Sequence, residues 1–312
     1  MLDPDIAALL PQIHAKKTPW SEFPLDGLRR GLKRNMQALD MDPVPLPEIR
    51  DVAIPGSHGD IPARLYRPDT AQPLPVLIYL HGGGWVTFDV DAFDPFCRFL
   101  ARHGQCVVLS VEYRLAPEHK FPAAIEDALA VLDWARANPG QTGGDGRVGL
   151  GGDSAGGNLA TVVSMLTRNE PARRPDLQLL IYPAVDLSEQ RDSYHAFASG
   201  HVLERQAMEF FIAHYLNHPD EKYDLRVSPL LQKDLSGLPP ALVFTAGFDP
   251  LRDEGARYAE RLRECGVPVH YRCFDTLVHG FLQMGKLAGP RRAITVLSEA
   301  VAQAWQSGEN KK

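Results

Sequence analysis

One serine of this chain stands in a setting typical of an activated nucleophile. Ser154 is the middle residue of the run Gly152-Asp153-Ser154-Ala155-Gly156, with an apolar strand pattern before it and a helical pattern after it. A sharp turn from strand to helix strains the serine backbone and exposes the hydroxyl, and glycine two residues to either side avoids collisions with neighbouring backbone. The pattern therefore predicts that Ser154 is a nucleophile.

Other interpretations of this glycine-rich run stay open on its residues alone. Gly149, Gly151 and Ser154 resemble a degenerate dinucleotide-binding fingerprint, although no acidic residue ends a strand about 20 residues later. A phosphate-binding P-loop would need a Gly-Lys-Ser/Thr sequence, which the run lacks. A purely structural turn is the third interpretation. The remainder of the chain has to decide between them.

A second glycine-rich run, His81-Gly82-Gly83-Gly84-Trp85, follows an apolar strand pattern at 76–80. Acyl transfer needs N–H donors preset around the oxygen that becomes an oxyanion, and consecutive glycines let backbone amides approach a ligand without interference from Cβ. Such a run pairs with a nucleophile turn, whose next residue, Ala155, supplies another amide. His81 precedes the serine, so we interpret it as a residue that fixes the loop rather than as the base.

Asp249 and His279 follow two later strand patterns, at positions that suit an acid and a base. Where a serine turn of this type occurs, the triad order along the chain is Ser, then Asp or Glu, then His. His279 would accept the proton of Ser154, and Asp249 would orient the imidazole. Asp253 is interpreted as part of an acidic first helical turn, and Asp275 is too close to His279 in sequence to reach it from another strand.

Composition and charge exclude several other classes of protein. The 312 residues carry a net charge of −6 without any basic stripe, so no nucleic-acid partner is expected. No stretch approaches about 18 apolar residues, and the acidic N-terminus lacks the features of a secretory signal, so we expect no membrane span and a cytoplasmic location. No metal-binding motif is present in the sequence. The cysteines are too few and too irregularly spaced for a disulfide framework, so we expect reduced thiols at Cys97, Cys106, Cys265 and Cys273.

The alternation of short apolar strands with helices predicts an α/β protein with a mostly parallel sheet covered on both faces. Two N-terminal helical patterns precede the first strand, and a hairpin around the turn 55–59 makes the sheet mixed. The expected strands are 48–54, 60–66, 76–80, 106–111, 148–150, 177–182, 241–246 and 269–274, and the expected later helices are 92–103, 122–137, 155–168, 205–216, 253–265 and 291–305.

Two segments do not fit the alternation and define the expected domain organisation. Residues 1–47 hold the two N-terminal helices, and residues 191–218 carry a helix where a strand is due. We expect residues 191–218 to be an insertion over the strand ends, and the N-terminal helices to lie outside the parallel sheet because no strand precedes them. Residues 48–190 and 219–312 then make up the catalytic domain.

Five motifs in this order resemble the hormone-sensitive-lipase-like family of microbial carboxylesterases, in its Gly-Asp-Ser-Ala-Gly branch. The likeness covers nearly the whole chain, and the motifs are His81–Trp85, Tyr113–Glu118, Gly152–Gly157, Asp249–Gly255 and His279–Phe281. The resemblance implies an α/β-hydrolase fold and a carboxylesterase of short- to medium-chain acyl esters that needs no cofactor. It implies that residues 1–47 and 191–218 together form a helical cap. It also implies Ser154, Asp249 and His279 as the triad, oxyanion donors at Gly83, Gly84 and Ala155, and permits a homodimer built on the sheet edge.

One departure from the family bears on the substrate. Phe88 stands where the family commonly has glycine, and its bulk lies next to the glycine-rich loop in the sequence. We expect the small-molecule ester to bind against Phe88 and other apolar residues of the loop and the cap, namely Trp85, Val202, Leu203, Phe210 and Phe211. An amidase or peptidase using the same triad is an alternative. A non-catalytic small-molecule receptor would show a missing triad residue, and here all three positions are filled.

Overall fold

The computed structural model describes residues 1–14 and 24–309, and part of the predicted N-terminal cap, residues 15–23, lies outside the described residues. Eight strands form one sheet in the order β1-β2-β4-β3-β5-β6-β7-β8. Strand β2 runs antiparallel to both β1 and β4, and the pairs from β4 through β3 to β8 are parallel. The strands are β1 Glu48–Gly56, β2 Gly59–Arg67, β3 Leu74–Leu80, β4 Val107–Val111, β5 Gly144–Asp153, β6 Gln178–Ile181, β7 Ala241–Phe248 and β8 Val269–Val278.

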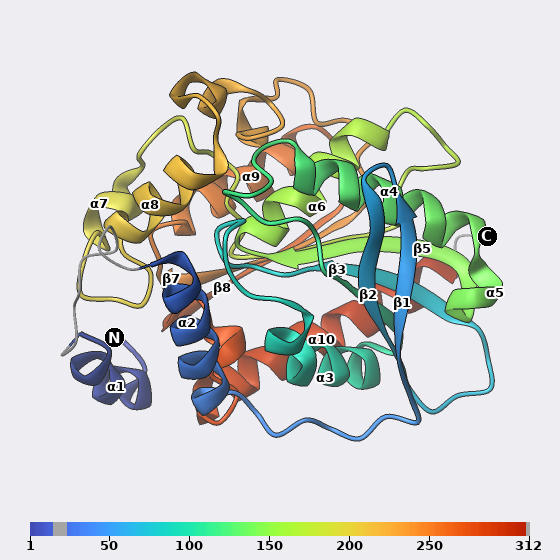
Figure 1. The fold of residues 1–312 in the computed structure, drawn as a ribbon, viewed down its shortest axis with the longest axis horizontal. Helices are drawn as coiled ribbons and strands as arrows, with labels where there is room; N and C mark the ends of the chain where they lie inside the picture. The colour runs from blue at the N-terminus through green and yellow to red at the C-terminus, as the bar shows by residue number, and fades with distance from the viewer. Residues whose placement is uncertain (15–23, 310–312) are drawn as a thin grey trace.

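Helices cover both faces of the sheet, with α4, α6 and α9 on one face and α3 and α10 on the other (Figure 1). The helices are α1 Pro4–His14, α2 Leu25–Leu39, α3 Asp94–Gly104, α4 Ala123–Ala137, α5 Pro139–Thr142, α6 Ala155–Thr167, α7 Asp192–Ala196, α8 Arg205–Tyr215, α9 Arg252–Glu264 and α10 Ala288–Glu309. Short 3-10 helices are η2 Val90–Phe93, η3 Pro219–Tyr223, η4 Pro229–Leu231 and η5 Phe281–Gln283.

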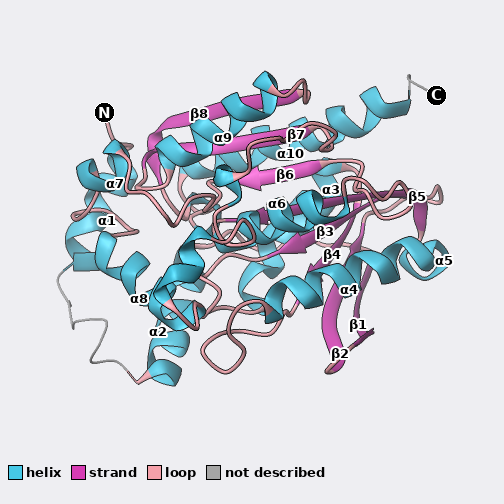
Figure 2. Cartoon of the chain, turned by 90° about the horizontal axis from the view of Figure 1, so that it is seen from above, coloured by secondary structure: helices cyan, strands magenta, loops and turns pink. Residues whose placement is uncertain are grey.

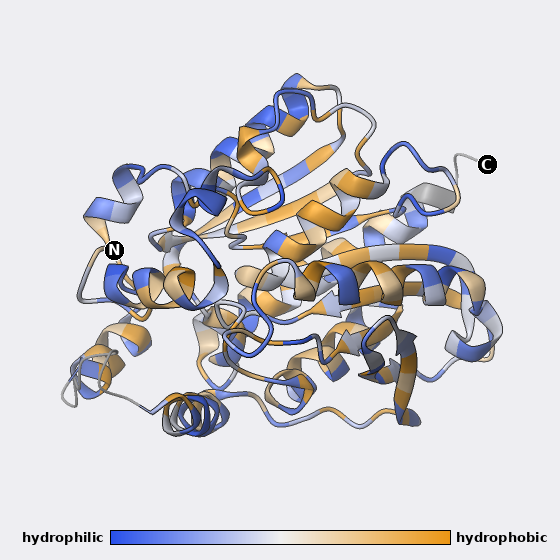
Figure 3. Ribbon diagram, turned by 45° about the horizontal axis from the view of Figure 1, so that its top comes forward, coloured by the Kyte–Doolittle hydropathy of each residue, from blue (hydrophilic) through white to orange (hydrophobic). Residues whose placement is uncertain are grey.

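The core forms on the two faces of the sheet because the inner strands carry apolar side chains on both sides. Strands β4 and β6 are buried along their whole length, and β3 is buried at all positions after Leu74. The central strands are coloured mainly as hydrophobic in Figure 3, whereas the covering helices carry both colours. Helix α9, for example, packs an apolar face on the sheet and presents a polar face outward, whereas α6 is buried along almost its whole length.

Helices α1, α2, α7 and α8 gather at one end of the molecule, the end toward which the arrow of β6 points in Figure 2. The carboxyl ends of parallel strands are the usual location of a site in an open α/β sheet. The residues that follow β3, β5, β7 and β8 therefore face this group of four helices.

The predicted alternation of strands and helices is confirmed, but several bounds differ; β5, for example, begins at Gly144 instead of residue 148. The last strand extends to Val278 instead of Phe274, because β8 is an edge strand whose exposed residues, such as Asp275, interrupt the apolar pattern. The short helices α5 and α7 were not expected, since neither is long enough to show a helical period. No helix within the described ranges has the length and apolar character needed to cross a membrane.

Candidate active site

Ser154 occupies a sharp turn between β5 and α6. Its backbone has φ 53° and ψ −118°, a conformation that non-glycine residues rarely adopt. The flanking glycines are required by space: a Cβ at Gly152 would overlap the backbone of Gly156, and a Cβ at Gly156 would overlap the carbonyl oxygen of Leu80. The strained serine and the reason for both glycines are as the sequence predicted.

The structure brings Ser154, His279 and Asp249 into one chain of hydrogen bonds. His279 Nε2 lies 3.0 Å from Ser154 Oγ, and His279 Nδ1 lies 2.8 Å from Asp249 Oδ2. The carboxyl of Asp249 is fully buried, and its other oxygen accepts the N–H of Leu251 at 2.8 Å. A carboxylate held in this way keeps the proton of the imidazole on Nδ1, so that Nε2 can accept a proton from the serine.

The alternative carboxylates are engaged elsewhere. Asp253 lies in the first turn of α9, as expected, and accepts the backbone N–H of Ser193 at 2.8 Å. It thereby ties α9 to the start of helix α7. Asp275 is an exposed residue of β8, and within the described ranges it makes no hydrogen bond to His279. Asp249 is therefore the carboxylate that the fold brings to the imidazole.

The glycine-rich loop after β3 has amides available for an oxyanion. Gly82 N–H donates to Asp153 Oδ1 at 2.8 Å and is thus occupied. Gly83 and Gly84 have φ 115° and 61°, and their N–H groups make no hydrogen bond within the part of the chain that the structure describes. Ala155 begins helix α6, so its N–H is one of the first-turn amides that lack a partner inside the helix.

Comparison with protein-family models matches residues 77–283 to the α/β-hydrolase fold family. This segment contains the serine turn, the glycine-rich loop and both partners of the serine. The chain belongs to the α/β-hydrolase family.

Relatives of this α/β hydrolase are ester hydrolases. It is 46% identical to the carboxylic ester hydrolase LipN of Mycobacterium tuberculosis over 255 residues, which cover 80% of this chain and 68% of that one. It is 36% identical to the ethyl acetate hydrolase of Pseudomonas putida, over 92% of this chain and 93% of the relative. The ester hydrolase EH1AB1 from the metagenome of Lake Arreo, solved with a bipyridine phosphonate derivative, superposes with a TM-score of 0.94 at 38% identity and covers 97% and 99% of the two chains.

Asp153 is a buried carboxylate of the site that the sequence analysis did not single out. Its Oδ1 accepts hydrogen bonds from Tyr79 OH at 2.7 Å and from Gly82 N–H at 2.8 Å, and its Oδ2 lies 3.4 Å from Tyr182 OH. Burial raises the pKa of Asp153 to about 6, and the hydrogen bonds from Tyr79 and Gly82 oppose that rise. A charged residue at the end of an otherwise apolar strand pattern was the signal that could have identified it.

Tyr182 packs against the imidazole of His279. Its ring centroid lies 4.4 Å from that of His279, and its backbone has φ 35° although it is not glycine. The side chain is fully buried. Tyr182 therefore links the base to the carboxylate of Asp153, and its role depends on tertiary contacts that no local pattern reveals.

His81 fixes the glycine-rich loop and does not contact the serine. Its ring stacks on Tyr113 with centroids 4.5 Å apart, and its Nδ1 lies 2.7 Å from the carbonyl oxygen of Gly82. Tyr113 OH in turn donates to the His81 carbonyl at 2.7 Å. Burial lowers the pKa of His81 to about 4, so the ring stays neutral at neutral pH.

Two of the expected pocket residues lie beside the glycines of the loop. A Cβ at Gly84 would overlap the ring of Phe211, which reaches the loop from helix α8. A Cβ at Gly83 would come within 2.8 Å of the Phe88 ring. Phe88 itself has φ 72°, the left-handed conformation that the glycine commonly found there in the family would adopt without strain.

The other expected pocket residues occupy different surroundings. Trp85 is 1% exposed and stacks on Tyr215 of α8, with ring centroids 4.3 Å apart and planes at 5°. Trp85 thus packs the loop against helix α8. Leu203 is buried in one core cluster and half-buried Phe210 packs against it, whereas half-buried Val202 packs against the cluster on the other face of the sheet.

The remaining reactive side chains form no second site. Cys97 and Cys106 are buried, Cys265 and Cys273 are half-buried, and all four are free thiols. Within the described ranges, no group of three or more His, Cys, Asp or Glu side chains is arranged to hold a metal ion.

Proposed function

We propose that this α/β hydrolase is a serine carboxylesterase that cleaves esters of short- and medium-chain acids through a covalent acyl-enzyme on Ser154. The observation that carries the proposal is the continuous chain of hydrogen bonds from Ser154 through His279 to buried Asp249. The carboxylic ester hydrolase, the ethyl acetate hydrolase and the phosphonate-bound ester hydrolase among the relatives support ester cleavage.

In the proposed reaction, Ser154 Oγ attacks the ester carbonyl carbon while its proton passes to His279 Nε2. The N–H groups of Gly83, Gly84 and Ala155 stabilise the oxyanion, and the occupied N–H of Gly82 supports this choice of donors. The intermediate collapses, and the alcohol leaves with the proton from His279. Water then attacks the acyl carbon by the same route, which releases the acid and restores Ser154.

The substrate range follows from the proposed cap, made of residues 1–47 and 191–218. Phe211 and Phe88 narrow the space beside the oxyanion donors. Each methylene that enters an apolar pocket adds about 0.8 kcal/mol until the pocket is full, so we expect the highest kcat/KM for acyl chains of roughly four to eight carbons. Ethyl acetate, for which one relative is named, carries a two-carbon acyl group, which is shorter than this range.

The variant Ser154→Ala tests the mechanism directly. We expect a folded protein whose esterase activity is lower by at least about 10³-fold, because the acyl-enzyme cannot form. A serine-directed phosphonate should label the wild type at Ser154 and leave the variant unlabelled. Ser164→Ala is the matched control, since Ser164 lies on α6 and bonds only to the Ala160 carbonyl among the hydrogen bonds of the described residues.

Near-normal turnover by folded Ser154→Ala would refute the proposed mechanism. Paired esters and amides of the same acid then test the reaction class. A carboxylesterase should cleave the ester far faster, whereas comparable rates on the amide would instead indicate an amidase that uses the same residues.

The branch of the family, a cytoplasmic location and a homodimer stay predictions. Strand β8 lies at an edge of the sheet, and an edge strand has backbone groups available to pair with a second copy. Sedimentation equilibrium of the purified chain would show whether such a dimer forms.

A further inference from the structure

The oxyanion loop, residues 81–89, holds an unfavourable backbone conformation. Gly83 and Gly84 have φ 115° and 61°, and Trp85 and Phe88 have φ 61° and 72° although both carry large side chains. Left-handed conformations of non-glycine residues persist only where surrounding contacts enforce them. The contacts that hold this loop therefore determine its shape together with its own sequence.

Arg29 of helix α2 reaches the oxyanion loop from the N-terminal segment. Its Nε donates to the carbonyl oxygen of Val86 at 2.8 Å, and its Nη2 donates to that of Ala116 at 3.0 Å. Both terminal nitrogens also contact Glu118 at 2.7 Å, a bidentate geometry that fixes the plane of the guanidinium. Ala116 N–H in turn donates to the Trp85 carbonyl at 2.8 Å. Arg29 thus joins the middle of the oxyanion loop to the segment that supports it.

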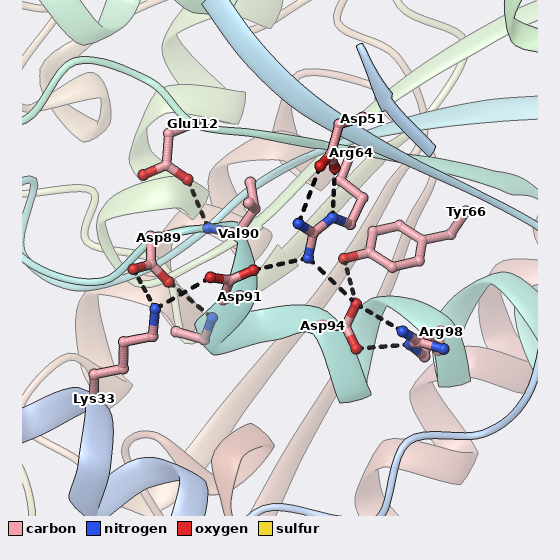
Figure 4. A network of polar contacts seen from close by, with 11 residues as sticks. Lys33, Asp51, Arg64, Tyr66, Asp89, Val90, Asp91, Asp94, Arg98 and Glu112 are labelled. Carbon is pink, nitrogen blue, oxygen red and sulfur yellow. Dashed lines mark hydrogen bonds and ion pairs between the residues drawn. The ribbon is translucent and has the colours of Figure 1, made fainter. Parts of the chain in front are cut away.

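Lys33, one helical turn after Arg29, holds the end of the oxyanion loop. Its ammonium lies 2.6 Å from Asp89 and 3.4 Å from Asp91, and Figure 4 shows it between the two carboxylates. Asp89 also accepts the N–H of Ala92 at 2.9 Å, which begins the 3-10 helix η2. The last residue of the loop is therefore fixed to helix α2 by charge.

Residues in and next to the sheet also bind Val90 and Asp91, the first residues of helix η2. Arg64 of β2 contacts Asp91 at 2.8 Å and Asp51 of β1 at 2.6 Å, and the backbone N–H of Val90 donates to Glu112 at 2.7 Å (Figure 4). Helix η2 is thus anchored on the sheet. The charged contacts of Lys33 therefore connect helix α2, and with it the cap, to helix η2.

Helix α8 contacts the oxyanion loop through apolar groups, unlike α2. Phe211 packs on Gly84, and Tyr215 stacks on Trp85. These apolar side chains pack against the loop but do not fix the direction in which its carbonyl groups point. The directional contacts come from α2, where Arg29 binds a carbonyl oxygen of the loop itself.

We propose that Arg29 and Lys33 are positioning residues that keep the oxyanion loop in its active conformation, so that helix α2 is required for catalysis and not only for covering the substrate. The inference rests on the proposed function, because it assigns a role in stabilising the oxyanion. Amide donors act only when they lie within hydrogen-bond distance of the developing charge, and a displacement of about 1 Å can lower a rate by about 10²-fold.

The test compares Arg29→Met, Arg29→Lys and Lys33→Met with wild type. Arg30→Gln and Arg34→Gln are matched controls, because both arginines are exposed on the same helix and neither makes a hydrogen bond or ion pair with another described residue. Three quantities are measured: kcat and KM for p-nitrophenyl butyrate, the inhibition constant of an alkyl trifluoromethyl ketone, and the melting temperature. The ketone forms an anionic tetrahedral adduct with the serine and therefore reports on the oxyanion donors.

For Arg29→Met we expect kcat to fall by at least about tenfold with KM within about twofold, and the inhibition constant of the ketone to rise by the same factor as kcat/KM falls. Arg29→Lys should recover part of the loss, since an ammonium can still reach one carbonyl oxygen. Lys33→Met should give a smaller loss of the same kind, and the controls should match wild type.

Wild-type kcat and wild-type ketone affinity in folded Arg29→Met and Lys33→Met would overturn the inference. A lower melting temperature with unchanged kinetics would overturn it as well, because the contacts would then serve stability alone. If Arg29→Met does not fold, Arg29→Lys and Lys33→Met decide by the same criteria. These results are independent of Ser154→Ala, whose retained activity would instead refute the proposed function.

Discussion

The buried carboxylate of Asp153 leads to the most discriminating prediction. One of its oxygens, Oδ1, accepts both strong hydrogen bonds, from Tyr79 OH and Gly82 N–H, while Oδ2 faces Tyr182 OH at 3.4 Å. Asp153→Ala removes both acceptors. Asp153→Asn keeps an oxygen in the Oδ1 position and places an amide donor opposite Tyr182, whose hydroxyl can accept as well as donate.

The two variants should differ strongly in stability. In Asp153→Ala, Tyr79 OH and Gly82 N–H stay buried without an acceptor, and each costs about 1–3 kcal/mol, which lowers the free energy of unfolding by about 2–6 kcal/mol. That is a large part of the roughly 5–15 kcal/mol that holds a typical domain together. Asp153→Asn keeps both bonds, so near pH 7 we expect a loss below about 1 kcal/mol.

The titration of the Asp153 carboxyl also makes the free energy of unfolding depend on pH. Burial raises the pKa of Asp153 to about 6 from 3.8, so between these values the native state binds more protons than the unfolded chain. The contribution of Asp153 to stability is then complete below about pH 4 and is lost as the pH rises through about 6, by at most about 3 kcal/mol. Asp153→Asn does not titrate, so its stability relative to wild type should increase from pH 4 to pH 6.

Urea unfolding followed by tryptophan fluorescence at pH 4, 5, 6 and 7 measures these free energies. Tyr79→Phe is the matched control, because it removes a donor and leaves the carboxylate bonded to Gly82. Equal losses in Asp153→Ala and Asp153→Asn would show that the hydrogen bonds do not hold the site together. Parallel pH curves for wild type and Asp153→Asn would refute the assignment of the titration to this carboxyl.

Three further changes test other parts of the structure. Gly156→Ala should prevent the chain from folding into an active enzyme, because the added Cβ would overlap the Leu80 carbonyl oxygen. Soluble expression and the esterase rate measure this, and normal values of both would contradict the turn geometry. Phe88→Gly relieves a left-handed strain of about 1–2 kcal/mol but loses the ring packed against Phe93, so the two effects offset and the melting temperature should change little. Without the ring, kcat/KM for longer acyl esters should rise, and an unchanged chain-length profile would exclude Phe88 from the pocket. Burial raises the pKa of Asp40 to about 7. The free energy of unfolding of Asp40→Asn relative to wild type, measured in urea, should therefore increase between pH 4 and pH 7. A difference between the two proteins that stays constant with pH would contradict that shift.

The sequence was sufficient for the parts of the site that local patterns define. The turn at Ser154 was predicted from the glycines two residues to either side, and the overlap that a Cβ at Gly156 would cause shows why glycine is needed there. Asp249 and His279 could be assigned because parallel strands bring their carboxyl ends to one edge of the sheet. Their distances to each other and to Ser154 follow from the fold and not from sequence spacing.

Contacts between distant segments could not be predicted in this way. Asp153 and Gly82 are 71 residues apart, and Arg29 and Val86 are 57 residues apart, so no local period connects them. Trp85 was expected to line the pocket, but its stacking on Tyr215 of helix α8 could not be predicted from the sequence. The direction in which such a side chain points depends on packing partners that the sequence does not specify.

The strand order has a consequence for how this enzyme is made. Strands β5 to β8 lie in the sheet in the order in which they are synthesised, so each can pair with a neighbour that already exists. Ser154 follows the first of them and His279 follows the last, 125 residues later. At usual translation speeds the serine leaves the ribosome roughly 6 to 25 seconds before the histidine. If Ser154 and His279 act as proposed, a nascent chain carries an unactivated hydroxyl until the last strand has joined the sheet.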